Sequence, residues 1–252
     1  MSLKLKNPHS ILAALRVRPQ DVLDIRLPKK GAAEAWDEVR DLAEFNRVKT
    51  GQGRMQDTRP HHRRQKGAGK QDDGGREGAG EALVRELPGV TLGELFADAQ
   101  ERAGGHGLWL GLDCIQDPHN LGAIVRTAAF FGVQGLLLTV DRSAPLSDTA
   151  YDVAAGGMEY LPFSVQTNLA RSLEVAKEAG LWTLGSSEHA EMKLSDVPLD
   201  RPWLLLIGNE AKGLRRLTFE NCDQICRIEP RGGVTSLNAS VAAGIMISAL
   251  AG

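Results

Sequence analysis

Apolar and polar residues alternate in a regular pattern along the second half of the chain. Short apolar runs typical of buried strands are separated by longer stretches whose apolar residues recur every three or four positions, as in an amphipathic helix. The predicted strands are 108–112, 135–140, 160–165, 181–185, 203–208 and 225–228. The predicted helices are 121–131, 147–156, 168–180, 213–221 and 236–250. Strands that alternate with helices are joined by parallel crossovers, so we expect an α/β fold with a doubly wound, mostly parallel sheet.

The first part of the chain follows a different pattern. Residues 32–44 carry apolar side chains at helical spacing and residues 91–103 repeat that spacing, so both segments predict helices. Residues 47–70 contain eight Lys or Arg, one Asp and almost no apolar residue, and residues 71–80 are rich in Gly and Asp. Segments of this composition cannot bury a core, which is typical of a flexible connection.

These differences divide the chain into three predicted parts. We expect a small N-terminal region over 1–50, a basic and then Gly/Asp-rich flexible linker over 51–90, and the α/β domain over 91–252. The net charge of the 252 residues is only −2, but the basic residues are concentrated before the α/β domain. We therefore expect segment 47–70 to contact a polyanion.

The three cysteines, Cys114, Cys222 and Cys226, are an odd number and predict no disulfide framework. Cys222 and Cys226 lack the second pair of ligands that a structural zinc site needs, and His61 and His62 lack partners at metal-binding spacing, so we expect no metal. No apolar run reaches the roughly 20 residues that span a bilayer, and the N-terminus lacks the apolar core of a signal peptide. We therefore expect a cytoplasmic protein with no membrane contact.

Three segments of the second half combine glycines with polar side chains at the ends of predicted strands. They are Asp117-Pro118-His119-Asn120-Leu121-Gly122 running on to Arg126, Gly208-Asn209-Glu210-Ala211-Lys212-Gly213-Leu214, and Ile228 through Ser236-Leu237-Asn238. Ligand-binding groups of open α/β sheets gather at this edge. The three segments together predict one site.

Each motif also has a local structural interpretation. Asn120 stands before a helical run and can cap its first turn, and Ser236 can do the same for the last helix. Gly122 and Arg126 are four residues apart on one helix face, so the glycine leaves room for whatever the arginine reaches. Gly208, which follows a buried strand, permits a tight turn and a close approach of the backbone to a ligand.

Taken together, the three motifs resemble the SpoU (TrmH) family of SPOUT RNA ribose methyltransferases over roughly residues 106–252. The family pattern is an Asn followed six residues later by an Arg, a Gly-x-Glu-Gly-x-Gly turn, and an Ile-Pro-Met lead into Gly and then Ser-Leu-Asn. This chain has Ala211 where the second motif has Gly, and Glu229-Pro230 where Pro-Met is usual. The stretch from Asn7 to Leu15 is loosely similar to the opening of the family's substrate-binding domain.

The resemblance implies more about the fold than periodicity can. It implies a deep trefoil knot in the C-terminal domain, a small α+β substrate-binding domain before it, and a homodimer. True knots are too rare for a sequence pattern to predict one. The apolar helix from Val241 to Leu250 is the candidate dimer contact.

The resemblance also implies the residues of the site. The implied catalytic residues are Arg126, Asn120, Glu210, Ser236 and Asn238. The implied S-adenosylmethionine-binding residues are Gly185, Ile207, Gly208, Gly213, Ile228, Pro230, Ser236 and Leu237. Glu210 is expected to accept hydrogen bonds from a ribose or to help position Arg126. Because a guanidinium is a poor general base, we expect Arg126 to orient the ribose hydroxyl and to stabilise the developing negative charge.

The predicted function is methyl transfer from S-adenosylmethionine to a ribose 2′-hydroxyl of ribosomal or transfer RNA. An RNA-binding module with the same fold and no turnover is the alternative, and a small-molecule α/β enzyme is disfavoured because it leaves segment 47–70 unexplained. Methylation of a pyrimidine carbon needs an activated cysteine, and Cys114 has no neighbour in sequence that would activate its thiol. The predicted product is therefore a 2′-O-methylated ribose.

Overall fold

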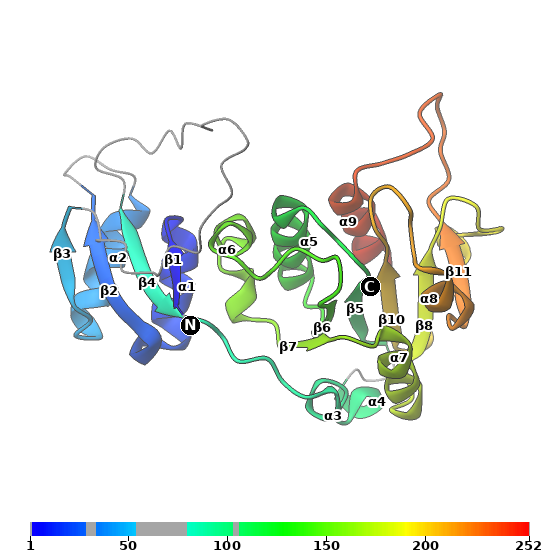
Figure 1. Cartoon of the computed structure of the whole chain (residues 1–252), viewed down its shortest axis with the longest axis horizontal. Coiled ribbons are helices and arrows are strands. Elements are labelled where there is room, and N and C mark those ends of the chain that lie inside the picture. Colours follow the sequence, from blue (N-terminus) through cyan, green and yellow to red (C-terminus); the bar gives the residue numbers. More distant parts are fainter. Residues whose placement is uncertain (1, 29–33, 54–79, 103–105, 252) are drawn as a thin grey trace. The chain divides into compact units, whose positions relative to one another are not determined.

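The computed structural model describes residues 2–28, 34–53, 80–102 and 106–251, and the chain forms two compact units, 1–86 and 87–252 (Figure 1). Most of the predicted basic segment and linker lies outside the described residues, so its flexibility stays a prediction. Each unit has its own sheet and its own helices.

Among its described residues, the N-terminal unit contains a four-stranded sheet and two α-helices. Its strands are β1 (Ser2–Leu5), β2 (Val22–Leu27), β3 (Thr50–Gln52) and β4 (Glu81–Arg85), in the order β1-β4-β2-β3, and its helices are α1 (Pro8–Val17), the 3-10 turn η1 (Pro19–Asp21) and α2 (Ala35–Phe45). Asn7 accepts a hydrogen bond from the His9 N–H at 2.9 Å and Pro8 takes the first helical position, so α1 begins where the local sequence favours a helix start. The unit has the α+β arrangement that we expected before the α/β domain.

The predicted linker over 51–90 is too long, because β4 lies inside it. Strand β4 runs antiparallel between β1 and β2, and its Ala82 and Val84 are fully buried opposite Leu5 and Leu3. A five-residue strand in the middle of a sheet depends on partners that are distant in sequence, so local composition did not reveal it.

The C-terminal unit contains a seven-stranded sheet in which every described pairing is parallel. Its strands are β5 (Leu108–Leu112), β6 (Gly135–Thr139), β7 (Phe163–Gln166), β8 (Trp182–Ser186), β9 (Met192–Lys193), β10 (Trp203–Ile207) and β11 (Gln224–Arg227), in the order β7-β6-β5-β10-β8-β11-β9. Its helices are α3 (Leu92–Leu95), α4 (Ala99–Arg102), α5 (Pro118–Phe130), α6 (Asp148–Ala154), α7 (Leu169–Glu178), α8 (Arg216–Glu220) and α9 (Ala239–Leu250), with 3-10 turns η2 (Gly157–Glu159) and η3 (Leu194–Asp196). The predicted α/β class is confirmed, and the trefoil knot stays a prediction.

Helices cover both faces of this sheet (Figure 1). Helices α5, α6 and α9 lie on one face and α3, α4 and α7 on the other. Trp109 and Leu204 of neighbouring strands pack against Phe96 and Leu173 in one buried cluster. Leu205 points to the opposite face and is also fully buried. Burial on both faces explains why the strands are continuous apolar runs in the sequence.

Two local predictions differ from the structure. The single helix expected over 91–103 is divided into α3 and α4, because the backbone at Asp98 has a φ of 51° and cannot continue a helix. Strand β9 was not predicted, since two residues are too few to show a periodicity.

Every helix in the described ranges is too short or too polar to span a lipid bilayer. The same ranges contain no group of three His, Cys, Asp or Glu side chains that could hold a metal ion.

Candidate active site

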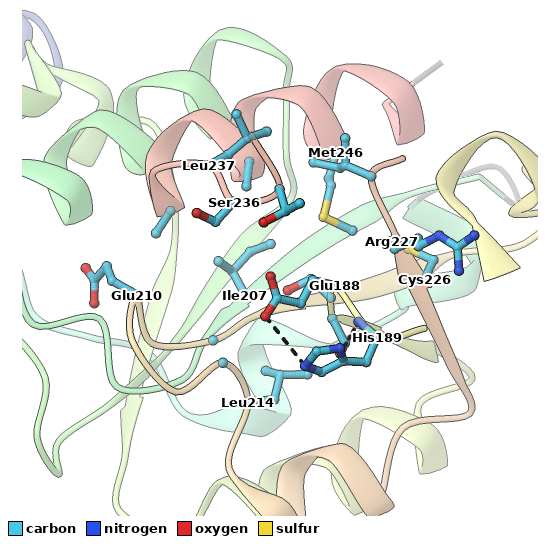
Figure 2. A pocket seen from close by; sticks show the side chains of 18 of the residues that line it. Glu188, His189, Ile207, Glu210, Leu214, Cys226, Arg227, Ser236, Leu237 and Met246 are labelled. Carbon is cyan, nitrogen blue, oxygen red and sulfur yellow. Dashed lines mark hydrogen bonds and ion pairs between the residues drawn. The ribbon is translucent and has the colours of Figure 1, made fainter. Parts of the chain in front are cut away.

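A large pocket opens at the carboxyl edge of the seven-stranded sheet, over the ends of β8, β10 and β11 (Figure 2). Its volume is about 980 Å³, which is large for a small-molecule site. From β5 the chain builds the sheet outward in one direction through β6 and β7, and it then adds β8, β10 and β11 on the other side of β5. Ligands of open α/β sheets bind beside such a reversal of strand order. The lining residues are 186–189, 207–214, 226–231 and 234–237, with Phe219 of α8 and Ala239, Ala242 and Met246 of α9.

The pocket combines an apolar interior with charged side chains. Figure 2 shows Ile207, Leu214 and Met246 around the central space and Glu188 directed into it. Glu210 lies at one side of the same pocket. Apolar walls suit a planar base, and carboxylates suit a ligand that carries positive charge.

The loop that follows β10, residues 208–214, has a closed and internally bonded shape. Asn209 and Gly213 exchange both backbone hydrogen bonds, at 3.0 and 2.9 Å. The Asn209 Oδ1 also accepts from two N–H groups of the loop, at 3.0 and 3.2 Å. Gly213 has a φ of 66°, and a Cβ at Gly208 would overlap the Gly213 backbone. The turn therefore requires glycine at both positions.

Ala211, at the position where the family motif has glycine, fits this loop. Its side chain is exposed, its backbone is not among the residues with positive φ, and its N–H is one of the two donors to Asn209. The alanine therefore introduces no backbone strain.

Asn120 connects the three predicted motifs. Its side-chain Nδ2 donates to the Glu210 Oε1 at 2.9 Å, and its Oδ1 accepts from the Asn238 Nδ2 at 3.0 Å. Asn120 is only 8% exposed, so both ends of its amide are satisfied by these partners rather than by bulk water. The structure thus brings together three of the predicted catalytic residues, which lie 90 and 118 positions apart in sequence.

The predicted capping role of Asn120 is wrong. Helix α5 begins earlier, at Pro118, whose fixed φ suits the first helical position, and Asp117 caps it by accepting from the His119 N–H at 2.9 Å. Asn120 therefore lies inside the helix, and its amide is available to Glu210.

The predicted cap of the last helix is also wrong. Asn238 caps α9, since its Oδ1 accepts from the Ser240 and Val241 N–H groups at 2.9 and 3.4 Å. Ser236 stands two residues before this cap and lines the pocket. One asparagine therefore both starts α9 and orients Asn120.

Arg126 lies on the exposed side of α5, six residues and about 9 Å along the helix axis from Asn120. Within the part of the chain that the structure describes, its guanidinium has no hydrogen-bond or ion-pair partner, and the expected contact with Glu210 is not made. The expected role of Gly122 in making room for Arg126 is wrong. A Cβ at Gly122 would lie 2.6 Å from the Ala150 carbonyl oxygen, so the glycine accommodates α6 instead.

Gly185, an expected cofactor contact, does not line the pocket. It is buried within β8, and a Cβ there would lie 2.6 to 2.9 Å from three side chains. At this end of β8, the pocket is lined instead by the residues after the strand, including Ser187, Glu188 and His189. These three residues were not predicted, although their position after a strand end at the same edge is a signal that identifies them.

The loop that joins β11 to α9, residues 229–238, is exposed along its whole length. Among the described residues, Pro230 to Leu237 make no hydrogen bond. At the start of the loop, the Glu229 carboxylate pairs with the Lys193 Nζ at 2.8 Å, and this hydrogen bond holds the pKa of Glu229 below its usual range. Glu229, which replaces the proline of the family motif, thus has a partner on β9.

All three cysteines are free thiols. Burial raises the pKa of Cys222 and of Cys226 to about 12, and burial is also the main reason that the pKa of Cys114 is raised. A raised pKa keeps a thiol in its protonated form, which is a poorer nucleophile than the thiolate. The site therefore contains no cysteine suited to attack on a base.

The lining residues fit S-adenosylmethionine. The apolar interior around Ile207 and Leu214 matches the adenine ring, and the backbone groups of the 208–214 loop offer donors and acceptors at its edge. The carboxylates of Glu188 and Glu210 match the positive sulfonium and ammonium groups of this cofactor.

The comparisons with known proteins agree with this geometry. A family model described as the SpoU rRNA Methylase family matches residues 107–248. The chain is 37% identical over 246 residues to the 23S rRNA (guanosine-2′-O-)-methyltransferase RlmB of Pseudomonas aeruginosa, covering 97% of this chain and 94% of that protein. It is 40% identical over 166 residues, 66% of each chain, to the putative TrmH family tRNA/rRNA methyltransferase YacO of Bacillus subtilis.

Solved structures share the fold. The SpoU methyltransferase AviRb from Streptomyces viridochromogenes, in complex with the cofactor AdoMet, matches with a TM-score of 0.73 at 22% identity, over 99% of this chain and 89% of that one. An AdoMet-bound rRNA methyltransferase from Sinorhizobium meliloti matches with a TM-score of 0.72 at 19% identity, over 99% of this chain and 86% of that one. The family model covers more than half of this chain and the P. aeruginosa relative aligns with nearly all of it, so the chain belongs to the SpoU rRNA methylase family.

Proposed function

We propose that this chain methylates the ribose 2′-hydroxyl of a guanosine in 23S ribosomal RNA. The coarser activity follows from the family: the chain is an RNA 2′-O-ribose methyltransferase that uses S-adenosylmethionine. The finer assignment is supported by two relatives, 37% and 35% identical along 97% of this chain, whose names specify guanosine in 23S rRNA.

The observation that carries the proposed site is the bridge from Glu210 through Asn120 to Asn238. It ties the loop after β10 and the start of α9 to α5, at the carboxyl edge of the sheet. In our proposal, these three residues and Ser236 surround the reacting centre. Polar groups held by one another keep their positions while substrate binds, which is the condition for aligning a nucleophile with a methyl group.

S-Adenosylmethionine supplies the methyl group on a positively charged sulfur, which makes that carbon electrophilic. In our proposal the chain holds this cofactor in the pocket, with its adenine in the apolar interior and its positive charge beside the carboxylates. The proposed cofactor contacts are Ile207, Gly208, Gly213, Ile228, Pro230, Ser236 and Leu237, and all of them line the pocket.

Arg126 is proposed to act on the RNA rather than on the cofactor. A guanidinium stays protonated at neutral pH, so it does not remove the proton of the 2′-hydroxyl. Its five donors can orient that hydroxyl, stabilise the developing alkoxide and bind the adjacent phosphate. The absence of a protein partner for Arg126 within the described ranges leaves those donors available.

Labelled methyl transfer to RNA tests the proposal. The protein is incubated with methyl-labelled S-adenosylmethionine and ribosomal RNA, which is then hydrolysed in alkali. A 2′-O-methyl group removes the internal nucleophile of alkaline cleavage, so label should remain in a dinucleotide. Label in mononucleotides only would mean base methylation, and no label in any RNA would support the RNA-binding module without turnover.

Replacing Arg126 with Ala separates its role from cofactor binding. We expect kcat to fall by about a hundredfold or more, because one preorganised donor to a developing oxyanion contributes that much. We expect the Kd for S-adenosylmethionine, measured by calorimetry, to stay within about threefold of wild type, because the interaction forms in the transition state. Turnover near the wild-type rate would remove Arg126 from the site.

The remaining assignments are also proposals. We propose that the N-terminal unit and segment 47–70 contact RNA phosphates, which a flatter salt dependence of RNA affinity after deletion of 54–70 would support. Val241 and Ile245 form an exposed apolar row on α9, and we propose this row as a homodimer contact, to be tested by light scattering. Three free thiols support a reducing cytoplasm as the location, to be tested by cell fractionation.

A further inference from the structure

The carboxyl end of β5 holds a carboxylate that the proposed reaction does not use. Asp113 follows β5 directly and is 0% exposed. Its Oδ2 accepts from the Arg215 backbone N–H at 3.0 Å and from the Thr218 hydroxyl at 2.8 Å, and its Oδ1 accepts from the Arg215 Nε at 2.6 Å. These three donors lie just after the end of the 208–214 loop, 102 or 105 residues further along the chain, and the neighbouring Cys114 Sγ also donates to Oδ1 at 3.4 Å.

The neighbouring residue holds the start of the same loop. Cys114 has a φ of 63°, and its carbonyl oxygen accepts from the Asn209 Nδ2 at 2.9 Å. The other side-chain atom of Asn209, Oδ1, accepts the two N–H groups that give the loop its shape. In addition, the Asp113 N–H donates to the Ile207 carbonyl at 2.9 Å, which fixes the end of β10. Two consecutive residues therefore hold both ends of the loop.

Complete burial makes this attachment hard to release. An ionised carboxylate that loses its partners inside a protein is strongly destabilised, because no water replaces them. Arg215 and Thr218 therefore stay against the buried Asp113 carboxylate. The end of the 208–214 loop is thereby attached to the end of β5.

We infer that Asp113 is a positioning residue for the cofactor: with the Cys114 carbonyl, its carboxylate holds the 208–214 loop in the shape that receives S-adenosylmethionine. Asp113 does not line the pocket, and it acts through Asn209, Arg215 and Thr218. The inference rests on the proposed cofactor site. It adds to that site a residue that the three motifs do not include.

The chain contains a matched control at the other edge of the sheet. Asp223, which precedes β11, accepts from the Thr183 N–H at 2.9 Å, from the Thr183 hydroxyl at 2.8 Å and from the Lys177 Nζ at 2.8 Å. Like Asp113, it accepts from a backbone N–H, a threonine hydroxyl and a cationic side chain, but its side chain is 28% exposed whereas Asp113 is fully buried. Because Asp223 lies at the amino ends of the strands and does not line the pocket, its loss affects stability without touching the loop.

The test compares Asp113→Asn with Asp223→Asn in the full-length protein, well below the melting temperature of either variant. An amide in place of Asp113 removes the charge and presents two donors to a cluster of donors, so the loop should move. We expect Asp113→Asn to raise the calorimetric Kd and the KM for S-adenosylmethionine by about tenfold to a hundredfold, as for a displacement of about 1 Å in a site. At saturating S-adenosylmethionine, kcat should recover most of its wild-type value. Asp223→Asn should lower the melting temperature and leave Kd and KM within about twofold.

Thr218→Val provides a second measurement if Asp113→Asn does not fold. Valine keeps the shape of threonine and removes one of the three donors, so the Kd for S-adenosylmethionine should rise by about threefold to tenfold. Equal Kd values in wild type, Thr218→Val and Asp113→Asn would overturn the inference and leave the proposed function intact. Equal losses of affinity for S-adenosylmethionine in Asp113→Asn and Asp223→Asn would also overturn the inference, because a loss of stability alone would then explain both. A wild-type protein that binds no S-adenosylmethionine would overturn the proposed site together with the inference.

Discussion

Two loops line opposite parts of the pocket, and they are built in opposite ways. The 208–214 loop is closed by its own backbone hydrogen bonds and attached to β5 at both ends. The 229–238 loop is exposed throughout, and its described contacts are confined to its ends, at Glu229 and at Asn238. Val234 in its middle is 76% exposed, although it lines the pocket.

This difference suggests different roles for the two loops in ligand binding. A loop that already has its bound shape binds a ligand without loss of conformational entropy, whereas a loop with few restraints loses entropy when it closes. In our proposal, the first loop therefore determines where the cofactor binds, and the second adapts to the cofactor and to RNA. Substitutions in the first loop should strongly reduce the affinity for S-adenosylmethionine, and substitutions in the second loop should change this affinity only slightly.

We expect the strongest effect from replacing Gly208 in the first loop, and Gly232 in the second loop provides the control. In Gly208→Val, the new side chain would overlap the Gly213 backbone, so the loop must open. We expect the calorimetric Kd for S-adenosylmethionine to rise by about a hundredfold, since forced overpacking costs about 1–3 kcal/mol. The matched control is Gly232→Val, where a Cβ meets no atom within 4 Å, and here we expect a change within about threefold. Equal effects of the two substitutions would contradict the division between the loops.

A smaller effect is expected from Asn120→Asp, which alters the residue that joins the two loops. Its new carboxylate would stand beside Glu210, where the amide Nδ2 now donates at 2.9 Å. Repulsion raises the pKa of such a pair, so the pair binds a proton as the pH falls and the hydrogen bond is restored. We expect about a tenfold higher Kd for S-adenosylmethionine at pH 8 and a difference from wild type that narrows toward pH 5.5. Calorimetry of both proteins at both pH values checks this, and a difference independent of pH would count against the bridge.

The smallest effect is expected from Glu229→Gln at the start of the exposed loop. Lys193 lowers the pKa of Glu229 in the folded protein. The ion pair therefore stabilises the folded state at a pH above the pKa of an unfolded glutamate, and this stabilisation is lost as the pH falls through the lower pKa of the folded state. Exposed ion pairs contribute little, so the Kd for S-adenosylmethionine should change by less than about twofold, and the change should vanish in about 0.5 M salt. A tenfold effect at neutral pH would mean that this loop is held as firmly as the other.

Local pattern was a good guide to the elements of the second unit. Each of its six predicted strands corresponds to a strand of the structure, because burial on both faces leaves a continuous apolar run. The three motifs lie at one edge of the sheet, as expected when parallel strands end together. The local pattern was a poorer guide to the first unit, where β4 follows a long segment and pairs with strands from the start of the chain.

The residue pattern predicted the α/β class and a site at the strand ends, and the three motifs identified the family. Only the tertiary structure showed that Asn120 bridges Glu210 and Asn238 rather than capping a helix, and that Asp113 holds a loop that begins 95 residues later. These hydrogen bonds join residues that are far apart in sequence, and a local pattern carries no information about them. Periodicity reports which side of one segment is buried, whereas a hydrogen bond between distant residues depends on which strands are neighbours, and strand order is decided by the packing of the whole sheet.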